Sequence, residues 1–187
     1  VGTITSRIEH FLEWKDPYPL KKTDLGDSST SQDVLIAGMF EKTNFLDLIQ
    51  NFTVFEPMDG RTIKKIARYQ QFRAVHKSIE RIKSGTDRKS KSGVIWHTQG
   101  SGKSLTMVFL TLKIRRDPEL CDYKMIFITD RTQLDTQLTA TFQNTQSETI
   151  HHANSVKELK ELLQTDSSDI ITAMVQKFQE SADENEF

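Results

Sequence analysis

The sequence of 187 residues has a single cysteine, Cys121, and no long run of apolar residues. One cysteine excludes an internal disulfide and fits the reducing cytosol. The lack of about 20 consecutive apolar residues excludes a membrane-spanning helix, and no secretory leader or transit peptide is recognisable. We therefore expect a cytoplasmic protein with no membrane partner.

Net charge is also nearly absent, at −1, but the charge is distributed unevenly. Residues 61–116 hold 15 Lys and Arg against only Glu80 and Asp87, so this stretch carries +13 and the rest of the chain −14. A stretch this basic can face an anionic polymer such as nucleic acid. Charged runs are also commonly just solvated faces, and the charge count alone leaves both interpretations open.

One segment has the pattern of a phosphate-binding loop. The apolar residues 94–96 predict a strand, the glycine turn at 100–104 follows, and residues 105–114 predict a helix. Strand, glycine turn and helix in this order are the context that such a loop requires. The glycines let backbone N–H groups close around a polyphosphate, and the start of the helix adds further donors.

Each residue type in this loop has an expected role. The candidate nucleotide-binding residues are Gly100, Ser101, Gly102, Lys103 and Ser104. Lys103 is the expected catalytic cation on the β- and γ-phosphates of ATP, and the Ser104 hydroxyl is the expected Mg²⁺ ligand. The strict motif has glycine where this sequence has His97, so the match is to the G-x-G-K-S core. We expect His97 to pack within the loop.

Helix and strand patterns alternate along the rest of the sequence. Helices are predicted over residues 6–15, 31–40, 44–49, 68–83, 130–142 and 155–163, and strands over 52–56, 62–66, 124–129, 149–152 and 169–175. Such alternation with short connections predicts an α/β fold with a doubly wound parallel sheet, which carries ligands at the carboxyl ends of its strands. We expect residues 1–60 to form a mainly helical accessory segment and residues 61–187 the ATP-binding part.

Two glutamines, Gln70 and Gln71, lie at the start of the helix predicted over residues 68–83. An amide can bond both the donor and the acceptor on an adenine edge, so a glutamine placed here would select ATP. The alternative, a solvated helix start with no ligand, stays open on the chemistry alone.

With these elements placed, the sequence resembles the R (restriction and translocation) subunit of type I restriction enzymes. The matching strings are ARYQQFRAV from Ala67, GVIWHTQGSGKSLTMVFL from Gly93, FITDRTQLDTQL from Phe127 and IITAMVQKF from Ile170. The resemblance implies part of the first RecA-like lobe of a helicase superfamily 2 motor. Such a motor hydrolyses ATP to pull duplex DNA past an anchored methyltransferase, and the implied partners are DNA and the methyltransferase and specificity subunits.

The resemblance also implies site residues. Gln71, three residues before Ala74, corresponds to the glutamine that contacts adenine in that family, while Lys103 and Ser104 correspond to its phosphate and Mg²⁺ contacts. The implied DNA-binding residues lie in two helicase motifs, the first with Arg131, Thr132 and Gln137 and the second with Thr172 and Gln176.

Several parts of such a motor are not recognisable in the sequence. No Asp-Glu-x-His follows an apolar strand, and no second lobe, arginine finger or nuclease domain is seen. Hydrolysis of ATP needs a group that positions the attacking water and charge stabilisation at the transferred phosphate. We therefore expect a fragment of a larger endonuclease subunit that is inactive alone. The alternatives are a P-loop kinase and a nucleotide-binding module with no motor role.

Overall fold

The computed structural model describes residues 1–4, 6–58, 60–129 and 150–176. The chain forms two compact units, Val1–Leu110 and Thr111–Phe187. Within the described ranges, no helix is both long enough and apolar enough to cross a membrane.

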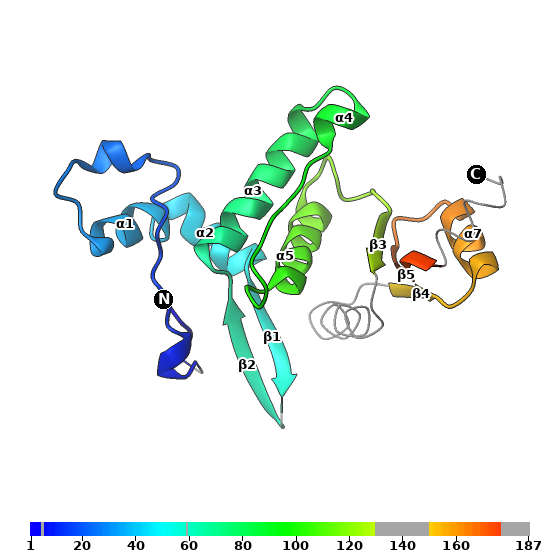
Figure 1. Cartoon of the computed structure of the whole chain (residues 1–187), viewed down its shortest axis with the longest axis horizontal. Coiled ribbons are helices and arrows are strands. Elements are labelled where there is room, and N and C mark those ends of the chain that lie inside the picture. The colour runs from blue at the N-terminus through cyan, green and yellow to red at the C-terminus, as the bar shows by residue number, and fades with distance from the viewer. Residues whose placement is uncertain (5, 59, 130–149, 177–187) are drawn as a thin grey trace. The chain divides into compact units, whose positions relative to one another are not determined.

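The first unit contains short helices, a hairpin and two long helices (Figure 1). Its elements are η1 (Ile8–His10), η2 (Lys22–Leu25), α1 (Ser31–Gly38), α2 (Lys42–Asn51), β1 (Thr53–Met58), β2 (Arg61–Ile66), α3 (Tyr69–Ser84), α4 (Arg88–Lys91) and the first part of α5 (Lys103–Arg116). The second unit contains the end of α5 followed by β3 (Met125–Thr129), β4 (Ile150–Ala153), α7 (Val156–Gln164) and β5 (Ile170–Met174).

The helix predicted over residues 6–15 is wrong, because only the single turn η1 forms there. This turn buries no residue, and Ile8 is 83% exposed. A ten-residue helix is marginal unless an apolar face packs against something. The segment is held instead by Trp14, whose buried ring lies 6.4 Å from the Tyr69 ring and 5.7 Å from the Phe72 ring, centroid to centroid.

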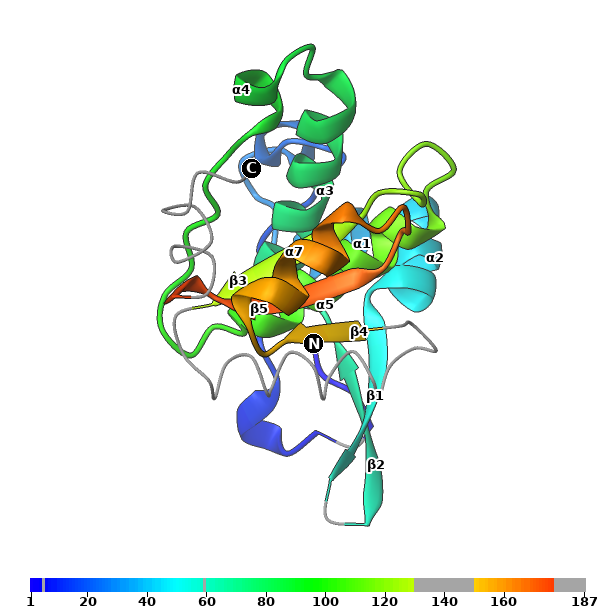
Figure 2. The ribbon, with the colours of Figure 1, turned by 90° about the vertical axis from the view of Figure 1, so that its right-hand side faces the viewer.

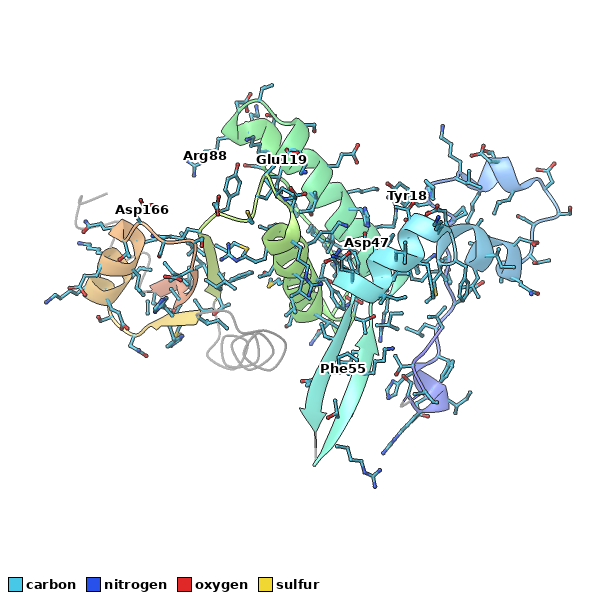
Figure 3. The ribbon with its side chains drawn as sticks, turned by 180° about the vertical axis from the view of Figure 1, so that it is seen from behind. Tyr18, Asp47, Phe55, Arg88, Glu119 and Asp166 are labelled. Atoms are coloured by element: carbon cyan, nitrogen blue, oxygen red, sulfur yellow. The ribbon has the colours of Figure 1, made fainter. Side chains whose placement is uncertain are left out.

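The predicted hairpin is confirmed. β1 and β2 pair antiparallel, with Thr53 opposite Ile66 and Phe55 opposite Lys64. Successive side chains of a strand point to opposite faces. Val54 is accordingly buried while Phe55, labelled in Figure 3, is exposed.

The core of the first unit is an aromatic cluster between the hairpin and the long helices. The Phe52 ring lies 4.7 Å from Phe72 of α3 and 5.5 Å from Phe109 of α5. His76 of α3 joins the cluster, with its ring 4.3 Å from Phe72 and its Nε2 2.8 Å from Asp47 Oδ2. Figure 3 labels Asp47 on α2. These contacts fix α2, α3 and α5 against one another (Figure 1).

The second unit is built on a parallel sheet with the strand order β3-β5-β4. Leu159 of α7 packs with Ile171 and Ala173 of β5, and Figure 2 shows α7 lying across the sheet. The Ser155 hydroxyl accepts a hydrogen bond from the Glu158 N–H (3.1 Å) and starts α7 as predicted. The α/β class and the parallel sheet are thereby confirmed.

The strand predicted over residues 94–96 does not form. Val94 is 94% exposed and Trp96 81%, and no described strand pairs with them. A strand needs a neighbour to take up its backbone N–H and C=O groups, and an apolar sequence does not provide one. Of the predicted order strand, loop and helix, the structure contains the loop and the helix.

Candidate functional site

The loop before α5 contains two glycines with positive φ. Gly100 and Gly102 have φ values of 75° and 86°, which glycine adopts without the steric cost of a side chain. The N–H and the hydroxyl of Ser101 both donate to the Thr98 carbonyl, at 3.3 and 2.7 Å. The loop is therefore closed by its own hydrogen bonds.

Lys103, the first residue of α5, lies across this loop. Its Nζ donates to the carbonyls of His97 (3.0 Å) and Thr98 (3.2 Å), and the side chain is exposed. A phosphate oxygen is a charged acceptor and makes a stronger bond to an ammonium than a neutral carbonyl does. The ammonium can therefore exchange these carbonyls for a phosphate. Ser104 follows in the first turn of α5 and is half-buried.

Gln71 links the start of α3 to the same loop. Its Oε1 accepts a hydrogen bond from the Arg68 N–H (2.8 Å), and its Nε2 donates to the Gly102 carbonyl (3.0 Å). An amide N–H can only donate and a carbonyl can only accept, so these partners fix the orientation of the side-chain amide. One N–H and further acceptor capacity of this amide remain for a ligand.

A cavity of about 1050 Å³ opens beside the loop, and Gln71, Gly100 and Gly102 are part of its wall. Its other walls come from the N-terminal segment, β2 and the start of α3. Five of the residues that line it are cationic, against one carboxylate, Glu13: they are Arg7, Arg61, Lys64, Lys65 and Arg68. Two of them have acidic partners, since Lys65 is paired with Glu56 and Arg7 lies 4.0 Å from Glu9. This charge favours an anionic ligand. Gln70 lines a different cavity, which borders the loop at His97, Thr98 and Ser101, and no hydrogen bond from Gln70 to the loop is present among the described residues.

The contribution of the hairpin to this cavity was missed from the sequence. In the sequence, three cations of β2 are recognisable only as part of the basic stretch 61–116: Arg61, Lys64 and Lys65. No local feature of the sequence indicates that they share a cavity with residues 100–104. The carboxylate of Glu13 has a specific partner, since the Ser31 hydroxyl donates to it (2.5 Å) and lowers the pKa of Glu13 below its usual 4.5.

The predicted DNA-binding residues are only partly described. Arg131, Thr132 and Gln137 lie outside the described residues. Thr172 in β5 is fully buried, with its Oγ1 3.0 Å from His152 Nδ1. Gln176 follows β5 and is exposed.

The chain is similar in sequence to known proteins. The sequence model of the SWI2/SNF2 ATPase family matches residues 70–187. The type I restriction enzyme MjaIXP endonuclease subunit of Methanocaldococcus jannaschii is 37% identical over 166 residues, covering 86% of this chain and 15% of the relative. The type I restriction enzyme HindI endonuclease subunit of Haemophilus influenzae is 31% identical over 194 residues, covering 100% of this chain and 18% of the relative.

The chain thus spans less than a fifth of the length of these two relatives. A shorter relative is the C-terminal part of the MpnIIP endonuclease subunit of Mycoplasma pneumoniae, 28% identical over 84% of this chain and 73% of the relative. The family match begins next to Gln71 and contains residues 97–104. The chain therefore belongs to the SWI2/SNF2 ATPase family, with type I restriction enzyme endonuclease subunits as its relatives.

Proposed function

We propose that the chain is the ATP-binding part of the DNA-translocating endonuclease subunit of a type I restriction system, in the cytoplasm of a bacterium or an archaeon. The observation that carries the proposal is the loop itself. Two glycines with positive φ lead into the 14-residue helix α5, with Lys103 at its first position and Gln71 bonded to the loop. Within this proposal, residues 61–187 are part of a RecA-like motor lobe, and residues 1–60 are its accessory segment.

In this proposal, different residues of the loop bind different parts of ATP-Mg²⁺. The backbone N–H groups at residue 100 and residues 102–104, together with the Lys103 ammonium, take the β- and γ-phosphates. The cations of β2 add a favourable field along the cavity wall. The Ser104 hydroxyl is the proposed Mg²⁺ ligand, and the spare N–H and acceptor capacity of Gln71 fit the adenine edge.

Turnover of ATP needs more than this loop. A residue has to position the attacking water, and further cations have to stabilise the transferred phosphate. The sequence offers no recognisable motif for either, so we propose that the chain alone binds ATP and hydrolyses it negligibly. ATP hydrolysis by the longer parent subunit that depends on DNA would favour a motor over a kinase.

The proposed DNA contacts are in the second unit. Gln176, exposed after β5, is a direct contact, together with Arg131, Thr132 and Gln137. Thr172 is buried, so we propose that it supports the strand end that carries Gln176. The proposed partners are duplex DNA and the methyltransferase and specificity subunits of the complex.

Calorimetric titration of the 187-residue chain with ATP-Mg²⁺ tests the proposal. We expect weak binding that is lost in Lys103→Ala, because this variant removes the cation from the phosphates. Lys42→Ala, which removes an exposed lysine of α2, is the matched control and should bind as the wild type does. Equal affinity of Lys103→Ala and the wild type would contradict the proposed site.

A further inference from the structure

The carbonyl of Gly102 is a point where three donors meet. It accepts hydrogen bonds from the Thr106 N–H (3.0 Å), the Thr106 hydroxyl (3.2 Å) and Gln71 Nε2 (3.0 Å). The two bonds from Thr106 belong to the first turn of α5. The bond from Gln71 is different, because it comes from another helix, 31 residues earlier in the chain.

Gln71 is placed to hold this carbonyl in one position. It is 2% exposed, and its other amide atom is fixed by the Arg68 N–H at the start of α3. A β-carbon added to Gly102 would lie 2.6 Å from Gln71 Nε2, so the side chain is packed directly against the glycine. The backbone of Gly102, at φ 86°, has no side chain of its own to restrain it.

We propose that Gln71 is a positioning residue of the phosphate-binding loop, which it holds ready for a polyphosphate whatever base the nucleotide carries. This inference deepens the proposed ATP site and rests on it. Contact with adenine would make Gln71 a residue of base selection. The hydrogen bond to Gly102 means that Gln71 affects the affinity for the phosphates. Its amide has further hydrogen-bonding capacity, so Gln71 can serve both roles.

The two roles predict different losses of affinity. A glutamine that only contacts adenine affects ATP and leaves GTP and inorganic tripolyphosphate unchanged. A glutamine that holds the loop affects all three ligands by the same factor. One neutral hydrogen bond is worth about 3- to 10-fold in an equilibrium constant. The fold should survive its loss, because Thr106 still supplies two donors to the Gly102 carbonyl.

The first experiment titrates ATP, GTP and tripolyphosphate, each with Mg²⁺, into the wild type, Gln71→Ala and Gln70→Ala. We expect Gln71→Ala to weaken all three by about 3- to 10-fold. An additional loss for ATP would add base selection to the positioning role. Gln70→Ala is the matched control and should resemble the wild type. Loss of ATP binding alone, or no loss in Gln71→Ala, would overturn the inference.

The second experiment needs no ligand. If the wild type binds none of the three ligands, the proposed function is contradicted, but the second experiment still tests the role of Gln71. Hydrogen exchange of the amides of residues 100–106 is measured in the nucleotide-free chain. We expect faster exchange in Gln71→Ala and in Gln71→Glu. The glutamate keeps an acceptor for the Arg68 N–H and loses the donor to Gly102. If exchange in Gln71→Glu occurs at the wild-type rate, the hydrogen bond from Gln71 to the Gly102 carbonyl does not hold the loop. The role of Gln71 would then be to accept the Arg68 N–H at the start of α3.

Discussion

Residues 94–96 and strand β3 are both short apolar segments with strong β propensity, and only β3 is a strand. β3 lies beside β5, with Met125 opposite Ile170 and Thr129 opposite Met174. Residues 94–96 have no such neighbour among the described strands, and their side chains are exposed. Strand propensity mainly reflects packing against neighbours, so the same local signal gives different structures.

The difference extends to how each unit positions its candidate site residues. In the second unit, a hydrogen-bonded sheet places Thr172, and Gln176 follows the end of the same strand. In the first unit, the proposed phosphate-binding loop follows an unpaired segment, and two side chains bond to it, the amide of Gln71 and the ammonium of Lys103. Backbone ladders are cooperative, whereas a few side-chain bonds can be removed one at a time.

The largest expected effect is on the free energy of unfolding. It compares Ile171, in the paired strand β5, with Ile95, in the unpaired residues 94–96. Ile171 in β5 is 1% exposed and Ile95 is 45% exposed. We expect Ile171→Ala to lower the free energy of unfolding by about 2–5 kcal/mol, since it leaves a cavity under α7. Ile95→Ala should change it by less than about 0.5 kcal/mol. Urea unfolding followed by circular dichroism measures both. Equal destabilisation would mean that residues 94–96 are packed in solution as β5 is.

The elements predicted correctly from the sequence are those with local signals. Helix α3 was predicted to within one residue at each end, because its apolar residues recur at helical spacing and Gly85 follows it. The hairpin was predicted from the turn that ends in Gly60 between two β-rich runs, and Gly60 has a φ of 73°.

The elements predicted wrongly depend on contacts that are distant in the sequence. Residues 6–15 have a helical pattern, but the apolar residues of that pattern, such as Ile8, are exposed, so the pattern was not sufficient. In the candidate site, the glycines and Lys103 were predicted from the motif. The bond from Gln71 to Gly102 was not predicted, because it joins residues 31 positions apart and uses an amide assigned to adenine.

An intermediate effect is expected at Thr172, the buried residue of the second unit's candidate site. Thr172→Val keeps the shape and removes the hydroxyl that meets His152, so we expect a loss of about 0.5–1.5 kcal/mol in the free energy of unfolding. Gln176→Ala should cost no stability, since Gln176 is exposed. If the proposed DNA contact is right, DNA binding by a full-length endonuclease subunit should be weaker in Gln176→Ala and unchanged in Thr172→Val. The reverse order would show that Thr172 leaves its buried position to contact DNA.

The smallest expected effect concerns acid pH and Asp169, the residue before β5. A hydrogen bond from Ser167 lowers the pKa of Asp169 below its usual 3.8, and His151, with Nε2 3.2 Å from Asp169 Oδ2, adds to this effect against the opposing effect of burial. Because the folded state then holds its proton less tightly than the unfolded state, this stabilisation is present above pH 3.8 and is lost as the pH falls through the folded pKa. The carboxylate is 29% exposed, so solvent screens the effect and keeps it small.

Asp169→Asn isolates the contribution of Asp169 to the pH dependence of stability. Other carboxylates also have lowered pKa values. In α1, for example, the Thr30 backbone N–H donates to Asp33 and lowers the pKa of Asp33. The asparagine does not titrate, so the stability difference between wild type and variant should shrink as the pH falls below about 4. Asp33→Asn provides the same test in the first unit, where the carboxylate lies in the first turn of a helix and not beside a strand. Acid unfolding curves of the three proteins measure both differences. A difference between wild type and Asp169→Asn that stays constant through this range would mean that the carboxylate of Asp169 has the same pKa in the folded and the unfolded chain.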